Sequence, residues 1–229
     1  AIDRSKFTQG DPMTSNIHAN NTRSPIGQEL HIHYAKGIFH AMRQRCNPKD
    51  RIYTGATLCE EWAKPKAAGF ESFYEWAVYE SGYADGYQLD KDILFPGNNL
   101  YAPHTCAFIP QYMNKLFTNC GGTKKVNAKS KPARTLPLGV QINYYRKNGN
   151  PSYTSQCRSL GKQATLGSFR TAMEAHVAWQ HAKIAAIHEC IDLYQMEDVH
   201  SVDIVQALLG RIDQLWKDID EGKETTLLQ

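Results

Sequence analysis

The stretch from Gly139 to Lys183 constrains the fold of this chain most strongly, because short strand-like segments lead directly into a helical one. Asn-Gly and Leu-Gly dipeptides, which favour tight turns, separate segments in which aromatic and basic residues alternate. The helical spacing then runs from about Thr171 to Tyr194. It starts with a threonine cap and Glu174 three residues later, the two residues of a capping box. The pattern predicts a β-meander followed by an amphipathic helix.

Charge is segregated along the chain. From Lys124 to His188, eleven basic residues face one acid, Glu174, although the net charge of the whole chain is only +3. From Asp192 onward, nine acids face three bases. A polyanion is the natural partner of the basic segment. A basic run by itself also occurs on any solvated surface, so only its combination with the strand pattern favours nucleic acid.

The strand and helix segment also contains a specific motif, Gly-Val followed by an aromatic residue, Gly-Lys, and a closing Leu-Gly-x-Phe-x-Thr-x-x-Glu-Ala. Its residues here are Gly139-Val140, Tyr153, Gly161-Lys162, Leu166-Gly167, Phe169, Thr171 and Glu174-Ala175. The motif resembles the ethylene-response-factor (APETALA-type) DNA-binding domain. That resemblance implies a three-stranded antiparallel sheet packed on a helix, with the sheet in the major groove of double-stranded DNA.

Strand side chains alternate between two faces, so one face of this sheet can pack on the helix while the other carries basic groups. We expect Val140, Ile142, Leu166 and Phe169 on the helix side. Arginine suits guanine edges and phosphates, and lysine suits phosphates. The residues expected to contact DNA are Arg146, Lys147, Arg158, Lys162 and Arg170.

A second motif lies in the N-terminal half. Its parts are Leu89-Asp90, Gly97-Asn98-Asn99, Tyr101, Pro103, Cys106 and Asn114. The order resembles phage HNH-type endonucleases, whose ββα-metal site holds one divalent ion on the scissile phosphate. The resemblance implies Asp90 as the metal carboxylate and Asn114 as a second ligand, with Mg²⁺ or Mn²⁺ as the cofactor. Asn98 or Asn99 would orient these groups.

The general base of this motif departs from the family pattern. Lys91 stands where the family most often has histidine, and a solvated lysine is protonated at neutral pH and cannot accept a proton. Three interpretations remain open: Lys91 holds the phosphate, His104 acts as a substitute base, or the site does not cut. Lys91 and Asp92 could also form a plain surface ion pair.

The sequence therefore predicts an α+β protein of several segments. These are a flexible arm (1–27), an HNH-like module (28–118), a basic linker (119–137), a three-stranded-sheet DNA-binding domain (138–195) and an acidic C-terminal helix (196–229). The length suits two small domains better than one large one. Apolar residues between Val199 and Ile219 recur at helical spacing, so the last helix packs on the core or pairs with another copy.

The function expected from these parts is a phage-type, metal-dependent HNH-like endonuclease or nickase that binds DNA. The alternative is a catalytically inactive DNA-binding or regulatory protein derived from such a nuclease. A third possibility is a protein-interaction module that uses the acidic helix. No apolar run approaches the ~20 residues needed to span a bilayer, so we expect no membrane partner and a cytoplasmic protein.

Overall fold

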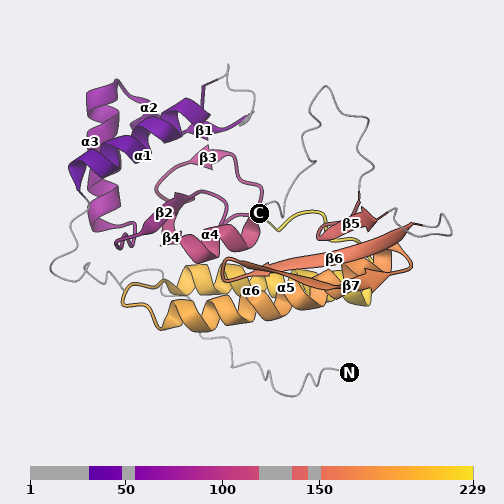
Figure 1. Cartoon of the computed structure of the whole chain (residues 1–229). Coiled ribbons are helices and arrows are strands. Elements are labelled where there is room, and N and C mark those ends of the chain that lie inside the picture. The colour runs from indigo at the N-terminus through magenta and orange to yellow at the C-terminus, as the bar shows by residue number, and fades with distance from the viewer. Residues whose placement is uncertain (1–30, 48–54, 119–135, 144–150, 229) are drawn as a thin grey trace.

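The computed structural model describes residues 31–47, 55–118, 136–143 and 151–228, and within them the fold is α+β, as predicted. The arm 1–27, most of the basic linker, Arg146 and Lys147 lie outside the described residues. Figure 1 shows the order of the elements, from three N-terminal helices to two long C-terminal helices with a sheet beside them. Within the described ranges, no helix is both long and apolar enough to cross a membrane.

Three helices and an aromatic cluster form the N-terminal part: α1 (Ile32–Arg45), α2 (Glu60–Ala63) and α3 (Lys66–Tyr79). The Trp62 ring lies 5.3 Å from that of Phe73 and 5.0 Å from that of Trp76, measured between centroids. Burying such large rings removes much apolar surface from water, which holds the helices together. Beside them, β1 (Thr57–Leu58) pairs in parallel with β3 (Leu100–Tyr101).

A strand, strand and helix unit follows at the position of the predicted ββα module. β2 (Tyr87–Asp90) pairs antiparallel with β4 (Ala107–Pro110), and α4 (Gln111–Phe117) packs against both strands. All four residues of β4 are buried, so this strand anchors the pair in the core. The elements match the expected shape, but a shape this small does not by itself assign a family.

The predicted three-stranded antiparallel sheet is present in the order β5-β6-β7. Its strands are β5 (Val140–Asn143), β6 (Ser152–Ser159) and β7 (Lys162–Phe169). The helix after it, α5 (Ala172–Gln195), begins with the predicted capping box. Thr171 accepts a hydrogen bond from the Glu174 amide, and the Glu174 carboxylate accepts one from the Thr171 amide. Sequence and structure agree closely here because strand turns and helix caps are set by local residues.

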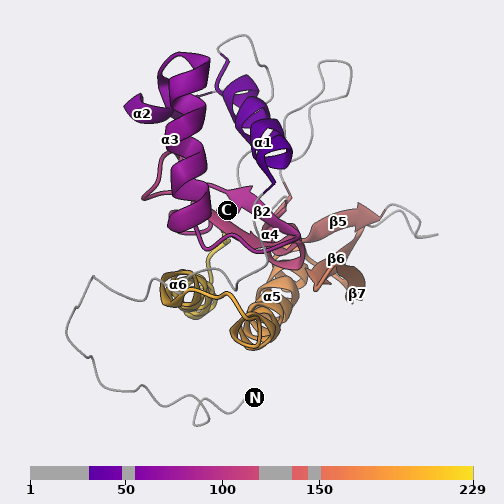
Figure 2. The ribbon, with the colours of Figure 1, turned by 90° about the vertical axis from the view of Figure 1, so that its left-hand side faces the viewer.

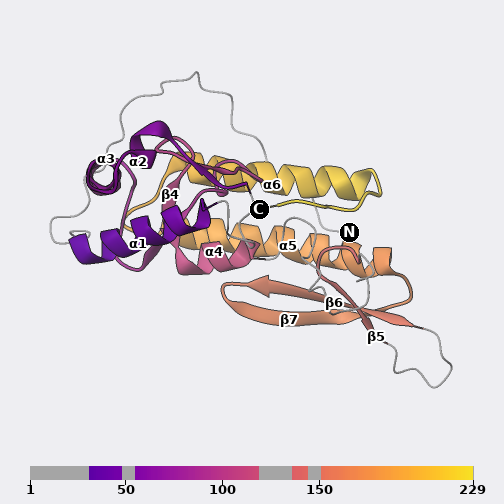
Figure 3. The ribbon, with the colours of Figure 1, turned by 90° about the horizontal axis from the view of Figure 1, so that it is seen from above.

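The C-terminal helix α6 (Val202–Asp220) packs on α5, so core packing rather than pairing with a second copy accounts for its apolar face. Leu208, Ile212 and Leu215 are among its buried residues. Figure 3 shows α6 on one side of α5 and the sheet on the other. The end-on view in Figure 2 shows α5 and α6 side by side beneath the N-terminal helices. Helix α5 is therefore the central element of the fold.

The described residues of the two predicted modules contribute to one hydrophobic core. That core extends from Phe39 in α1 to Leu215 in α6 without a break. Polar contacts also cross the expected boundary. The Tyr87 hydroxyl donates a 2.8 Å hydrogen bond to the Val199 carbonyl, and the Lys183 ammonium donates one of 2.8 Å to the Leu116 carbonyl. Such long-range packing leaves no periodic signal in the sequence.

Candidate functional site

Asp90, the expected metal carboxylate, closes a turn at the end of β2. Its Oδ1 accepts hydrogen bonds of 2.7 Å from the backbone N–H groups of both Asp92 and Ile93. An aspartate that binds the amides two and three residues ahead forms an Asx turn, a structural use of the side chain. One of its two oxygens is therefore already engaged by the protein.

The environment of Asp90 disfavours its charged form. Burial raises the pKa of this carboxyl group above its ordinary value, and the charge of Asp92 adds to the effect. The amides of Asp92 and Ile93 and the charge of Lys91 act in the opposite direction and offset part of it. The charged form of Asp90 is stabilised mainly by the two backbone amides of its own turn.

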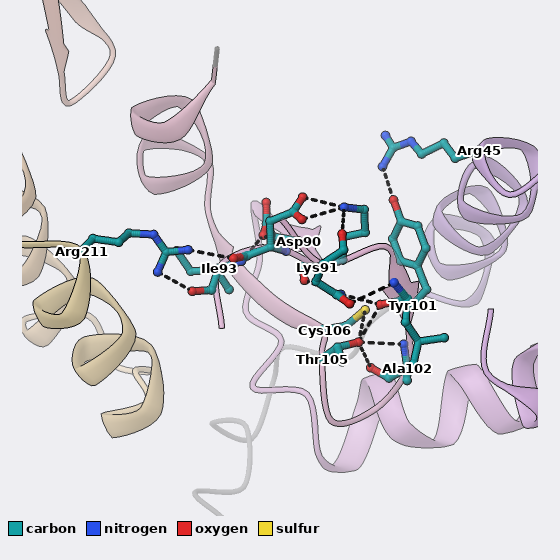
Figure 4. A network of polar contacts seen from close by, with 12 residues as sticks. Arg45, Asp90, Lys91, Ile93, Tyr101, Ala102, Thr105, Cys106 and Arg211 are labelled. Atoms are coloured by element: carbon teal, nitrogen blue, oxygen red, sulfur yellow. Dashed lines mark hydrogen bonds and ion pairs between the residues drawn. The ribbon is translucent and has the colours of Figure 1, made fainter. Parts of the chain in front are cut away.

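Lys91 forms an ion pair with its neighbour. Its ammonium group lies 2.7 Å and 2.8 Å from the two carboxylate oxygens of Asp92 and also donates to the Asn98 carbonyl. Figure 4 shows this lysine among the polar contacts of the site. Only 14% of each partner's side chain is exposed. The ion pair between Lys91 and Asp92 is present, but it is largely buried rather than a plain surface pair, and the Lys91 ammonium donates to acceptors within the protein.

The Gly97-Asn98-Asn99 loop is held by its own side chains. Asn98 donates through Nδ2 to the carbonyls of Lys91 and Leu100, at 2.9 Å and 2.6 Å, and its Oδ1 accepts from the Leu100 amide. The Thr105 hydroxyl donates to the Leu100 carbonyl at 2.8 Å. These hydrogen bonds hold the loop in place within the protein.

Asn114 lies near Asp90 in the structure, whereas His104 does not line the same cavity. Asn114 Nδ2 donates a 2.9 Å hydrogen bond to Gln88 Oε1, and Asn114 lines one small cavity together with Asp90. That cavity has a volume of about 10 Å³, room for about one water molecule. His104 is exposed on the loop after β3 and does not line it. The structure brings Asp90 and Asn114 together and leaves His104 outside.

Arg211 of α6 also lines this cavity, although the sequence did not single it out. Its guanidinium donates to the carbonyls of Asp92 at 2.7 Å and Ile93 at 2.8 Å. Figure 4 shows the contact between Arg211 and Ile93. It also donates to the carbonyls of Ala207 and Leu228. Arg211 lies on the apolar stripe of its helix, between buried leucine and isoleucine positions. An arginine among these apolar positions is the sequence feature that could have indicated a buried cation.

Arg211 is a buried cation at neutral pH. Burial lowers the pKa of its guanidinium to about 10, while the charges of Asp90 and Asp92 favour the protonated form. Only 3% of the residue is exposed. A value near 10 still leaves the group charged at pH 7. The cavity lined by Asp90 and Asn114 therefore has a positive charge from α6 in its wall.

These groups, as arranged, do not fit a divalent metal ion. Asp90 has one oxygen engaged by two amides, Asn114 is bound to Gln88, and the cationic Arg211 lies in the same cavity. Among the residues that the structure describes, no group of three or more His, Cys, Asp and Glu side chains could hold a metal ion. We therefore derive no catalytic step through a metal at this place.

The second candidate site is the face of the β5-β6-β7 sheet that points away from α5. Strand register and alternation place two sets of side chains on opposite faces. Val140 and Cys157 are buried on the α5 side, and the Ser159 hydroxyl there donates to Glu189 of α5. The opposite, outer face carries amide and hydroxyl groups with one arginine: Gln141, Thr154, Gln156, Arg158, Gln163, Thr165 and Ser168.

The outer-face side chains of β6 and β7 are linked to one another. Arg158 Nη2 donates to Gln163 Oε1 at 3.5 Å, and Gln163 Nε2 donates to Gln156 Oε1 at 2.7 Å. Arg170, just after β7, is exposed. Lys162 is exposed but lies opposite Ser159, on the α5 side of the sheet. The expectation that all these bases share one face is therefore wrong for Lys162.

The comparisons with known proteins add no relative. No protein-family model, no curated protein and no solved structure matches this chain.

Proposed function

We propose that this protein binds double-stranded DNA through the outer face of the β5-β6-β7 sheet and does not cut it. One observation carries the proposal: the sheet packs on α5 by one face, while its other face is polar and contains a guanidinium held among amides. None of the residues described in β5, β6 and β7 is acidic. A polyanion can therefore approach this face without meeting a like charge on the strands.

The chemistry of the outer face suits base edges as well as phosphates. A β-ribbon fits the major groove, where arginine pairs with guanine and glutamine or asparagine with adenine. Arg158, Gln156 and Gln163 provide both side-chain types on neighbouring strands. Their mutual hydrogen bonds restrict their rotamers before DNA arrives, which lowers the entropy cost of binding.

The test is binding to duplex DNA, measured by fluorescence anisotropy over a range of salt concentrations. Arg158→Ala should weaken binding and, if the guanidinium meets a phosphate, reduce the salt slope by about one unit. Lys217→Ala, which removes one exposed charge from α6, is the matched control and should bind as the parent does. Equal affinities for the parent and both variants would overturn the assignment of this face.

Metal-dependent cleavage is the second candidate, and one observation favours it: Asp90 and Asn114 line the same cavity of a ββα unit. The engaged oxygen of Asp90 and the charge of Arg211 favour binding without cleavage instead. Supercoiled plasmid with Mg²⁺ or Mn²⁺ distinguishes the two. Intact plasmid with parent protein supports our proposal. Nicking that disappears in Asp90→Asn, a variant able to keep the turn, would establish cleavage.

A further inference from the structure

Three side chains on the outer face of the sheet form a chain of hydrogen bonds with one direction. Arg158 Nη2 donates to Gln163 Oε1 at 3.5 Å, and Gln163 Nε2 donates to Gln156 Oε1 at 2.7 Å. Arg158 and Gln163 are cross-strand partners, and Gln156 lies two residues before Arg158 on the central strand β6. The three groups therefore lie together toward the end of the face where β6 turns into β7.

The charge of Arg158 sets the direction of this chain. A guanidinium has five N–H donors and no acceptor, so the amide beside it turns its oxygen toward it. The Gln163 nitrogen then faces Gln156, and the Gln156 oxygen faces Gln163. The terminal torsion of a glutamine is otherwise broad. The chain of hydrogen bonds thus holds the amide of Gln156 in one of its two orientations.

Gln156 is the member of this chain that still has hydrogen-bonding groups to offer. Among the residues that the structure describes, its Nε2 donates to no acceptor, and its Oε1 has a second lone pair beyond the one that Gln163 uses. Gln163 is engaged at both its oxygen and its nitrogen. Gln156 therefore presents a donor and an acceptor side by side. That pair matches the N7 acceptor and the N6 amino donor of adenine in the major groove.

We propose that Gln156 determines the base specificity of the outer face by pairing with adenine, and that Arg158 and Gln163 are positioning residues that orient its amide. This inference rests on the proposed binding of DNA by the same face. Thr165, the cross-strand partner of Gln156, adds a methyl group at the same place, and threonine methyl groups suit the C5-methyl of thymine. The face accordingly selects an A·T base pair.

The test uses the full chain and begins with duplexes that the parent protein retains from a random library. Sequencing gives the preferred base at each position. Each preferred A·T pair is then changed to G·C, and both affinities are measured by fluorescence anisotropy at one salt concentration. The parent should discriminate at such a pair by about tenfold. Replacing the adenine with 7-deaza-adenine, which keeps base pairing but lacks the N7 acceptor, should also weaken binding.

The variants are compared by the ratio of the two affinities, because a ratio cancels any loss of folded protein. Gln156→Ala should abolish the discrimination. Gln163→Met keeps the length of the side chain but removes its donor and acceptor, so it should reduce the ratio while affinity for the G·C duplex changes little. Gln141→Ala removes another outer-face glutamine, on β5 and outside the chain of hydrogen bonds. It is the matched control and should keep the parent's ratio.

The outcomes separate this inference from DNA binding itself. A Gln156→Ala protein that keeps every base preference of the parent would overturn the inference. Equal retention of all duplexes by the parent would overturn it too, while DNA binding by the sheet would stand. A parent protein that retains no duplex would overturn the proposed function and this inference with it. An unchanged ratio in Gln163→Met would overturn the positioning role of Gln163.

Discussion

Gly139 packs directly on the indole ring of Trp179, so the start of β5 and the first turns of α5 are in close contact. A Cβ at Gly139 would lie 2.6 Å from Trp179 Nε1 and closer still to Cδ1 and Cγ. The backbone there has φ +75°, in the left-handed region that favours glycine. The Trp179 ring in turn stacks on His176, with centroids 5.3 Å apart. This contact fixes how the sheet lies on its helix.

Gly139→Ala should destabilise the protein by about 3 kcal/mol or more, because it adds a steric clash to the strain of a positive φ. Gly161→Ala is the matched control: its φ is +83°, but a Cβ there meets nothing within 4 Å. That variant should lose only about 1–2 kcal/mol. Urea unfolding followed by circular dichroism measures both losses. Equal losses would mean that the indole can move aside.

His176 should make stability depend on pH. It accepts a hydrogen bond from the Thr225 amide through Nε2 and contacts the Leu138 carbonyl through Nδ1, which requires the neutral ring with its proton on Nδ1. Burial lowers the pKa of His176, against smaller opposing effects of the Leu138 carbonyl, Glu224 and Asp218. The unfolded state therefore binds the proton more readily.

The stabilising contribution of His176 is accordingly complete above its ordinary pKa of about 6.5 and is lost as pH falls through the lower folded value. His176→Gln should be less stable than the parent at pH 7, yet lose less stability between pH 7 and pH 5. Denaturant unfolding at both pH values gives the comparison. Identical acid sensitivity of the two proteins would rule out this histidine as the source.

Asp90 should matter chiefly through the turn it closes. Asp90→Ala leaves the amides of Asp92 and Ile93 without their acceptor and should cost about 1–3 kcal/mol. Asp90→Asn keeps an acceptor oxygen and should lose less. Chemical unfolding of both variants at pH 7 makes the comparison. If asparagine were as damaging as alanine, the charge of the carboxylate, rather than its acceptor, would be the essential feature.

Two basic residues at opposite ends of β7 should differ in DNA binding. Arg170 is exposed just beyond the strand, in line with outer-face Ser168, whereas the register puts Lys162 on the α5 side. Arg170→Ala should therefore weaken duplex binding more than Lys162→Ala does, although each removes one exposed charge. Anisotropy titrations at a single salt concentration provide the readout. A larger loss for Lys162→Ala would show that DNA lies at the edge of the sheet instead.

Much of the sheet and helix region could be predicted because its signals are local. Leu160-Gly161 forms the turn between β6 and β7, and Thr171 with Glu174 marks the first residues of α5. The break predicted at Leu166-Gly167 is wrong, because β7 continues through these residues to Phe169. The apolar spacing of the last helix was equally readable. The candidate site was harder to predict from the sequence. Asp90 and Asn114 do share a cavity, but the groups that engage them, above all Arg211, are distant in the chain.

Counting basic residues along the chain is limited in the same way, because burial depends on residues that are distant in the sequence. Lys183 contributed to the positive charge assigned to the middle of the chain, yet it is buried, with its ammonium on the Leu116 carbonyl. Arg211, counted among the few bases of an acidic segment, is buried with its guanidinium on the carbonyls of Asp92 and Ile93. Charge along a sequence does not say which side chains reach the surface.

The sequence by itself determined the turn between β6 and β7 and the capping box of α5, because tight turns and helix ends depend on residues a few positions apart. Only the tertiary structure decided that the expected modules share one core, that Lys162 leaves the outer face, and that Arg211 lies beside Asp90. Each of these depends on packing between residues far apart in the chain. Burial and desolvation then set their charges and contacts, and neither can be read from neighbours in sequence.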